Sequence, residues 1–280
     1  MIIGFLGKGG SGKSSAATQM ALFFHTQGKT VLAVDADHNM DLSYNLCNGQ
    51  LPEMKYIGGS LKDMQTFINL PDSSKYSEAF LVDITAQFSL SPADIITTQY
   101  TKKINTTMYL MAAGPQTDTV LYGKACSHSL STALKVYLPL LTLQENEVVV
   151  VDEKAGADGV TTGIVTGIDI GVIVCEPSLH SIKTAKQIAG LMDFYQTPYL
   201  FVGNKISDSE DKDFIEKELG ITPVVYLPES NNVQRNPSGT VLEWQDELEE
   251  IVTVAQTLNN NNRLVRTRMK FTRNHKFAHH

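Results

Sequence analysis

The segment Gly7-Lys8-Gly9-Gly10-Ser11-Gly12-Lys13-Ser14 has the spacing G-x-x-x-x-G-K-S, which is typical of a phosphate-binding loop. Its glycines allow the backbone to curl around an anion and to turn its N–H groups inward. Lys13 would bring positive charge to the terminal phosphates, and Ser14 would offer its hydroxyl to Mg²⁺. The predicted nucleotide-binding residues in this segment and directly after it are Gly9, Gly10, Ser11, Gly12, Lys13, Ser14 and Ser15.

The residues on either side of the loop support this interpretation. The apolar run 2–6 is typical of a buried parallel strand. Downstream, Ala17, Met20, Ala21 and Phe24 recur with the spacing of one helix face, and Gly28 is a stop signal. A strand, a glycine loop and a helix therefore follow in the required order. The alternative is a glycine-rich turn with a chance lysine.

Lys8 is a second lysine inside the loop, and with it the segment resembles the deviant Walker A ATPases, whose loop reads K-G-G-x-G-K-S/T. This family includes the ParA and MinD ATPases, the nitrogenase iron protein and the ATPase that matures carbon monoxide dehydrogenase. The resemblance implies a homodimer that forms face to face around ATP, with Lys8 and Lys13 as catalytic residues and Lys8 reaching the partner's nucleotide. The alternative role for Lys8 is that of a solvated loop lysine.

Three acidic residues follow a second apolar strand, predicted over 30–34. Carboxyl ends of strands are where open α/β sheets bind ligands. The resemblance implies that Asp37 lies near the attacking water and that Asp41 belongs to the first switch loop, which makes both catalytic candidates. Asp35 is interpreted as a structural acid. The alternative is a cluster of loop caps.

Four valines at 148–151 end in Asp152, which predicts a central parallel strand with a Walker B aspartate. Asp152 would bind Mg²⁺ through water, together with Ser14. The following residues 153–156 resemble the D-x-x-A-G second switch of the maturation ATPase. Lys154 departs from that pattern, which puts the partner contacts at this point in doubt.

The strand predicted over 198–203 ends at Asn204-Lys205, and the resemblance implies that Asn204 binds the base. The guanine-specific pattern N-K-x-D would need an aspartate where Ser207 stands, and this favours ATP. Backbone groups of Pro228 and Glu229 would edge the adenine, because 228–234 resembles the base-binding loop of the nitrogenase iron protein.

Cys126 and His128 lie where relatives place metal-binding cysteines. With Cys126 alone and no cysteine near the second switch, a shared iron–sulfur cluster and electron transfer are disfavoured. Two chains could still supply a Cys₂His₂ set for Zn²⁺ or Ni²⁺. The alternative is a free interface cysteine beside a surface histidine. Cys175 is interpreted as a core residue.

The overall composition indicates an α/β protein with an ordinary core, with 42% hydrophobic residues in 280 and a net charge of −7. We expect no transmembrane segment and no signal peptide, and the three scattered cysteines favour a cytoplasmic protein. Six basic residues and no acidic ones lie in 263–280, after a run of four asparagines. We expect residues 1–258 to form the ATPase domain and 259–280 to be a disordered polar and basic tail. Contact of this tail with RNA or another nucleic acid, an anionic membrane or the body is the alternative.

Alternating strands and helices predict a single doubly wound, mostly parallel sheet with helices on both faces. Residues 48–99 carry no recognisable chemistry. The resemblance implies a Mg²⁺-dependent dimeric ATPase that helps to mature a client metalloenzyme, with nickel delivery as the family role. The alternatives are a ParA/MinD-type positioning ATPase, which acts by surface binding, and a nucleotide switch without turnover.

Overall fold

The computed structural model describes residues 1–70, 87–115, 132–157, 163–235 and 242–277. An eight-stranded sheet has the order β10-β9-β8-β1-β7-β2-β5-β4, and every pair in it is parallel except β4 with β5. This confirms the predicted mostly parallel sheet. Its strands are β1 (Ile2–Gly7), β2 (Thr30–Asp35), β4 (Lys102–Lys103), β5 (Met108–Ala112), β7 (Glu147–Asp152), β8 (Ile170–Cys175), β9 (Tyr199–Ile206) and β10 (Val225–Pro228).

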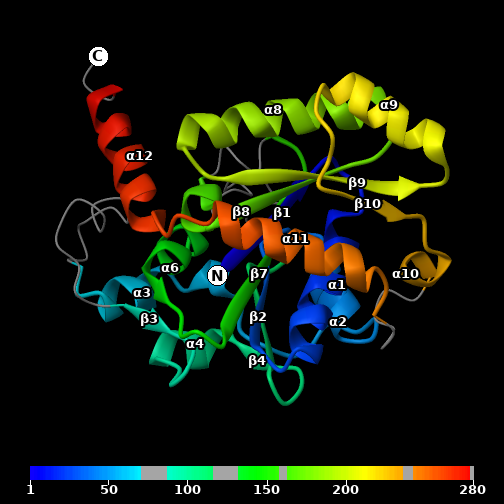
Figure 1. Ribbon diagram of the computed structural model, residues 1–280. Helices are drawn as coiled ribbons and strands as arrows, with labels where there is room; N and C mark the ends of the chain where they lie inside the picture. Colours follow the sequence, from blue (N-terminus) through cyan, green and yellow to red (C-terminus); the bar gives the residue numbers. More distant parts are fainter. Residues whose placement is uncertain (71–86, 116–131, 158–162, 236–241, 278–280) are drawn as a thin grey trace.

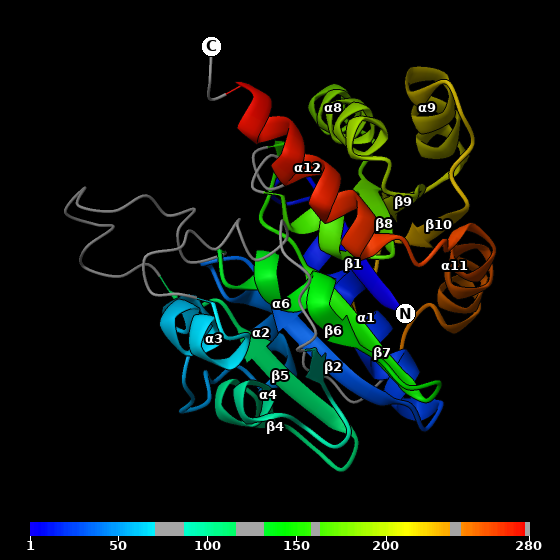
Figure 2. The same ribbon diagram turned by 90° about the vertical axis from the view of Figure 1, so that its left-hand side faces the viewer.

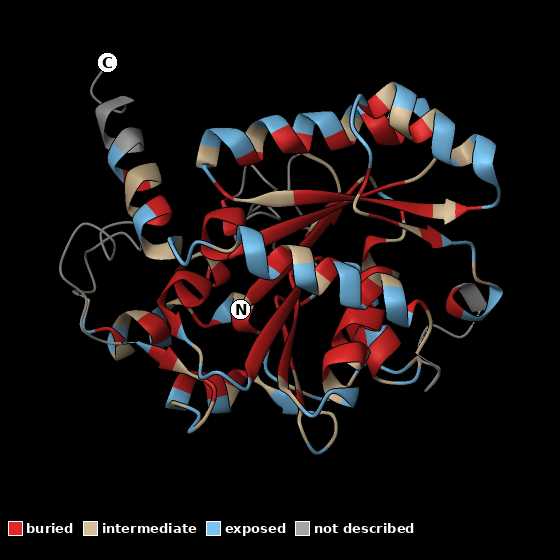
Figure 3. Ribbon diagram, in the orientation of Figure 1, coloured by how far each residue is buried: buried red, intermediate tan, exposed pale blue. Residues whose placement is uncertain are grey.

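The central strands are buried on both faces, as their continuous apolar sequences require. Along β7, Val149 and Val151 face one hydrophobic cluster, and Val148 and Val150 face the other. Figure 3 shows this buried layer between the two more exposed layers of helices. The fold therefore has three layers, with a core on each side of the sheet.

Helices cover both faces, as expected (Figure 1). One face packs against α1 (Lys13–Thr26), α2 (Asp41–Leu46), α10 (Asn231–Arg235) and α11 (Gln245–Leu258). The other packs against α3 (Leu61–Phe67), α4 (Ile95–Tyr100), α6 (Leu134–Leu140), α8 (Leu179–Tyr195), α9 (Ser209–Leu219), α12 (Arg263–Phe277) and the 3₁₀ helix η4 (Ile164–Gly167).

The region that was weakest in sequence signals also contributes to the core. It contains the 3₁₀ helix η1 (Ile57–Gly59), α3, α4 and β3 (Phe88–Ser89), which pairs in parallel with β6 (Leu141–Thr142). Phe88 stacks on Phe67 and contacts Tyr137, with ring centroids 5.1 and 4.8 Å apart. These elements are short and nonpolar only in part, and so their sequences lack a long periodic pattern.

The expectation of a disordered C-terminal tail was wrong for residues 263–277, which form α12 beside the end of α8 (Figure 2). Residues spaced as one helical face dock on the body. Arg263 donates two hydrogen bonds of 2.7 Å to Asp169, Arg266 donates to the Ile168 carbonyl, and Phe271 is buried. The sequence analysis interpreted the basic residues of this segment as a sign of a solvated tail. In the structure, some of the same residues form the face that docks on the body.

Among the described residues, no helix is long and apolar enough to cross a membrane. The parallel strands all end at one edge of the sheet, and the loops that follow β1, β2, β7, β8 and β9 therefore come together there.

Candidate functional site

The loop between β1 and α1 has the conformation that its glycines permit. Gly10 and Gly12 have φ of 84° and 89°, in the left-handed region that glycine adopts without strain. The Ser11 N–H donates to the Lys8 carbonyl at 3.1 Å, which closes the turn. Helix α1 begins at Lys13, and its N-terminus therefore faces this loop. A side chain at Gly12 would collide with Asn204, because a Cβ there would lie 2.1 Å from Asn204 Nδ2.

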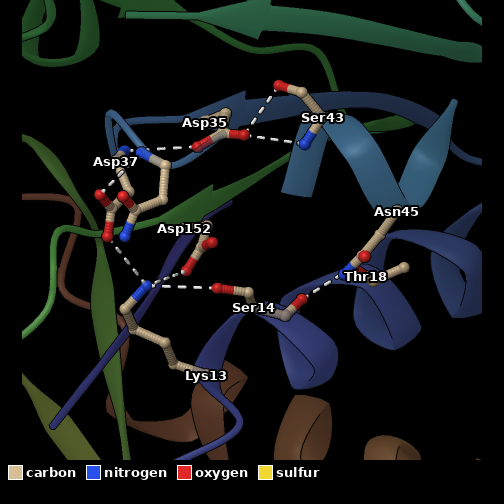
Figure 4. Close-up of polar contacts among 9 residues, drawn as sticks. Lys13, Ser14, Thr18, Asp35, Asp37, Ser43, Asn45 and Asp152 are labelled. Atoms are coloured by element: carbon tan, nitrogen blue, oxygen red, sulfur yellow. Dashed lines mark hydrogen bonds and ion pairs between the residues drawn. The ribbon is translucent and has the colours of Figure 1, made fainter. Parts of the chain in front are cut away.

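Lys13 is the centre of a buried polar cluster at this sheet edge (Figure 4). Its ammonium lies 3.1 Å from Asp152, 3.4 Å from Asp37 and 3.2 Å from the Ser14 hydroxyl. Burial alone would lower the pKa of Lys13, but the charges of Asp152 and Asp37 outweigh it and raise that pKa. The lysine is therefore held as a cation between two carboxylates from β7 and from the loop after β2.

Asp35 shapes the loop after β2. It accepts hydrogen bonds from the Ser43 N–H at 2.8 Å and the Ser43 hydroxyl at 2.7 Å, and its other oxygen accepts from the Asp37 N–H at 3.3 Å. Burial, with the charge of Asp152, raises the pKa of Asp35 to about 7. This agrees with its interpretation as a structural acid, and its bond to the Asp37 backbone helps to hold Asp37 beside Lys13.

The residues predicted to bind Mg²⁺ offer oxygen ligands of the kind that this cation prefers. Asp152 is fully buried, and its Oδ2 has no hydrogen-bond partner among the described residues. The Ser14 hydroxyl lies within reach of the same ammonium as Asp152 Oδ1. A buried carboxylate oxygen without a partner is costly in a folded protein. A hydrated divalent cation would satisfy it, and Ser14 and Asp152 therefore fit the predicted magnesium site.

Two of the predicted catalytic residues lie outside the Lys13 cluster. Asp41 is the first residue of α2 and is exposed, and none of the hydrogen bonds or ion pairs found in the described parts of the chain joins it to Lys13. The Lys8 side chain is 38% exposed and pairs with Glu176 at 3.4 Å. The structure therefore brings together Lys13, Ser14, Asp37 and Asp152, with Lys8 at the rim.

The predicted base-binding residues lie at the same sheet edge, at the ends of β9 and β10. Asn204 is buried, and its side-chain amide donates to the Ser11 carbonyl at 2.8 Å. Pro228 ends β10, and the Glu229 N–H donates to the Ile206 carbonyl at 3.1 Å. Both residues are exposed. Gly9 and Ser15 are part of the loop and of the first turn of α1, respectively.

The sequence analysis gave no role to three charged residues of this edge, Glu153, Glu176 and Lys205. Glu153 is fully buried, and neither of its carboxylate oxygens has a hydrogen-bond partner in the described chain. Burial, with the charge of Asp152, raises the pKa of Glu153 to about 8. Glu176 follows β8 and pairs with both Lys8 and Lys205. Their position in the sequence could have identified them as site residues, because all three are charged residues at the carboxyl ends of buried strands.

Cys126 and His128, the candidates for an interface metal site, lie outside the described residues. Within the described residues, no group of three or more histidine, cysteine or acidic side chains could hold a metal ion. Cys175 is buried at the end of β8, which confirms its interpretation as a core residue, and burial raises its pKa to about 12.

Comparison with known proteins agrees with this geometry over nearly the whole chain. Residues 2–271 match the model of the CobQ/CobB/MinD/ParA nucleotide binding domain, and the match extends past the expected domain end at Leu258. An uncharacterized ATP-binding protein of Methanocaldococcus jannaschii is 29% identical, with 92% of this chain and 99% of that protein covered. The carbon monoxide dehydrogenase accessory protein CooC of Rhodospirillum rubrum is 26% identical, over 77% of this chain and 78% of that protein.

Solved structures show the same fold at low sequence identity. The ParA family ATPase of Chlorobium tepidum superimposes with a TM-score of 0.56 at 20% identity, over 96% of this chain and 97% of that one. Its likeness concerns the fold, while the family match and the cluster around Lys13 concern the nucleotide site. The chain belongs to the CobQ/CobB/MinD/ParA family of P-loop nucleotide-binding ATPase domains.

Proposed function

We propose that this protein hydrolyses ATP with Mg²⁺ and dimerises around the nucleotide. The observation that carries the proposal is the buried Lys13 ammonium, held between Asp152 and Asp37 at the start of α1. A fixed cation beside backbone N–H groups suits the charge that develops on transferred phosphoryl oxygens. Ser14 and, through water, Asp152 would hold the Mg²⁺, which neutralises phosphate charge when bound.

Asp37 is the residue we assign to the attacking water. Its Oδ2 lies in the Lys13 cluster, and its Oδ1 accepts a hydrogen bond from the Asn39 N–H at 3.2 Å, so the carboxylate is oriented by the loop. Such a carboxylate can orient a water or accept its proton. Asn204, Pro228 and Glu229 would surround the base, and Lys8 would contact the nucleotide of the partner subunit.

Steady-state phosphate release from Mg²⁺-ATP tests this proposal. Lys13→Ala should lower turnover by about 10²-fold or more, because the cation at the phosphates is lost. Lys186→Ala, a change on the exposed side of α8, is the matched control and should retain the wild-type rate. A wild-type rate in Lys13→Ala would refute the assignment. Tight ATP binding without turnover in the wild type would instead identify a nucleotide switch.

We further propose that the ATPase assists metal insertion into a client metalloenzyme. The support is the similarity to a carbon monoxide dehydrogenase accessory protein, together with the positions of Cys126 and His128 in the sequence. Two subunits would supply two thiolates and two imidazoles, which suit tetrahedral Zn²⁺ or Ni²⁺. The metal content of the purified dimer should exceed background and should fall in Cys126→Ser and in His128→Ala. Equal content in all three proteins would remove the metal role and favour a ParA/MinD-type positioning function, which nucleotide-dependent DNA or lipid binding would reveal.

A further inference from the structure

One carboxylate at the edge of the site is shared by two lysines. Glu176, the first residue after β8, accepts from Lys205 at 2.7 Å on Oε2 and from Lys8 at 3.4 Å on Oε1. The Glu176 side chain is 17% exposed, whereas the two lysine side chains are 38% and 39% exposed. Its backbone is fixed as well, because the Glu176 N–H donates to the Ser181 hydroxyl at 3.0 Å. The carboxylate is thus less exposed than either of the two lysines that it binds.

Lys205 reaches this carboxylate from a distorted position in β9. In the pairing of β10 with β9, Leu227 faces Asn204 and Pro228 faces Ile206, so Lys205 is the extra residue of a bulge. Its φ of 60° lies in the left-handed region, which is unfavourable for a residue with a side chain. Strained residues of this kind persist where the surrounding structure holds them. The bulge directs the ammonium toward the phosphate-binding loop, where it also donates to the Gly10 carbonyl at 2.6 Å.

The two lysines differ in how firmly they are held. Lys205 makes two short contacts, one to Glu176 and one to the loop backbone. Lys8 makes one long contact with the same carboxylate, and a partly exposed pair at this distance contributes little free energy and is readily exchanged. Burial alone would raise the pKa of Glu176, but the hydrogen bonds and charges of Lys205 and Lys8 lower it below its ordinary value. Glu176 is therefore ionised and attracts Lys8.

We infer that Glu176 and Lys205 are positioning residues. They set how readily the Lys8 side chain is released from Glu176 to contact the phosphates of the nucleotide bound by the partner subunit. The Glu176 carboxylate restrains Lys8, and the charge of Lys205 weakens that restraint by neutralising part of the carboxylate. The inference rests on the proposed cross-subunit role of Lys8. It predicts opposite effects of two neighbouring substitutions, which a purely structural role of this cluster does not.

The test is the dissociation constant of the dimer at saturating Mg²⁺ and non-hydrolysable ATP analogue, measured by sedimentation equilibrium. Glu176→Gln removes the charge with little change of shape and should tighten the dimer by about 2- to 30-fold, because each dimer contains two such weak, partly exposed pairs. Lys205→Met should weaken the dimer by a similar factor, since Glu176 then attracts Lys8 alone. Lys205→Arg keeps the charge and should stay near the wild type. The effects of Glu176→Gln and of Lys205→Met on the dissociation constant should both be smaller at high salt.

Lys205→Gly is a second variant in case Lys205→Met folds poorly, because glycine tolerates the left-handed backbone without strain. It should weaken the dimer in the same direction. An unchanged constant in Glu176→Gln, or a change of the same sign in the Glu176 and Lys205 variants, would overturn the inference.

Lys8→Ala separates this inference from the function on which it rests. If Lys8→Ala dimerises as the wild type does, the proposed cross-subunit role fails, and the inference fails with it. If Lys8→Ala prevents dimerisation but Glu176→Gln behaves as the wild type, only the inference fails. The supporting result is a Lys8→Ala protein with a weaker dimer, in which the further change Glu176→Gln has no effect.

Discussion

The side-chain amide of Asn204 donates a 2.8 Å hydrogen bond to the Ser11 carbonyl, which joins the end of β9 to the phosphate-binding loop across 193 residues of sequence. The adjacent Lys205 donates a hydrogen bond to the carbonyl of Gly10, the residue before Ser11. Two hydrogen bonds thus join the loop proposed to contact the base to the loop proposed to contact the phosphates. Selectivity for the base and geometry at the phosphates should therefore respond together to changes in residues 204–207.

We predict that the protein prefers ATP to GTP by at least about tenfold, because a guanine would lack the carboxylate partner that N-K-x-D proteins provide. Ser207 stands at that position, and its N–H donates to Asp211 at 2.8 Å. Competition binding with both nucleotides measures the preference. Ser207→Asp should narrow it, and Ser207→Ala is the matched control that should leave it unchanged. A GTP preference in the wild type would contradict the interpretation of the loop after Asn204, in which Ser207 replaces the guanine-binding aspartate.

Asp37 and Asp41 should differ in their effects on turnover. We predict that Asp37→Asn lowers kcat by about 10²–10⁴-fold with little change in ATP affinity, because a neutral amide neither orients water as a carboxylate does nor accepts its proton. Asp41→Asn should cost less, since Asp41 is exposed at the start of α2. Single-turnover phosphate release and ATP binding, measured on both variants, decide between them. A larger loss of kcat in Asp41→Asn would show that Asp41 enters the site when nucleotide is bound.

The parts of the site that could be predicted from the sequence are those where local pattern determines structure. The glycines around Ser11 require a tight turn, and four valines before Asp152 require a buried strand with an acid at its end. Because parallel strands all end at one sheet edge, the order of elements places Asp37 and Asp152 at the same edge as Lys13, whereas the catalytic role of Asp37 came from the family resemblance.

The parts that could not be predicted depend on contacts between distant segments. The pairing of Lys205 with Glu176 needs a bulge in β9, and no local sequence pattern predicts that bulge. The docking of α12 is another such case. Arg263 is apparent from sequence only as one charge in a basic tail, whereas in the structure it occupies both oxygens of the fully buried Asp169. Composition predicts whether a segment is polar, but it does not predict whether its charged residues pair with a buried residue elsewhere in the fold.

The buried Asp169 makes Arg263 a sensitive point for stability. Asp169 also accepts the Ile2 N–H at 2.7 Å, so it links α12 to the start of β1. We predict that Arg263→Ala lowers the free energy of unfolding by about 3 kcal/mol, because removing one partner leaves a buried charge uncompensated. Urea denaturation measures this difference. Val265→Ala, on the exposed side of the same helix, should change stability by less than about 0.5 kcal/mol. Equal stability of the two variants would mean that α12 is not docked in solution.

The docking of α12 should also make stability depend on pH through Lys270. The Lys270 ammonium lies 5.2 Å from the centre of the Tyr195 ring and beside Gly163, where a Cβ would be 1.4 Å from its nitrogen. Burial lowers the pKa of Lys270 to about 8, from 10.5 for an ordinary lysine. Between these values the unfolded chain binds more protons than the folded one, and the free energy of unfolding therefore rises with pH in this window.

We expect this contribution to reach about 1.5 kcal/mol between pH 8 and 9.5, at about 1.36 kcal/mol for each pKa unit. Other groups oppose it, since burial raises the pKa of Cys175 and so lowers stability as the thiol of the unfolded chain ionises. These other groups are present in both the wild type and Lys270→Met. Their contributions therefore cancel in the difference between the two free energies of unfolding. Urea titrations at several pH values should give a wild-type curve that rises relative to the Lys270→Met curve from pH 8 upward. Parallel curves would mean that Lys270 is solvated in both states, and α12 would then pack more loosely against Gly163 and Tyr195 than these contacts indicate.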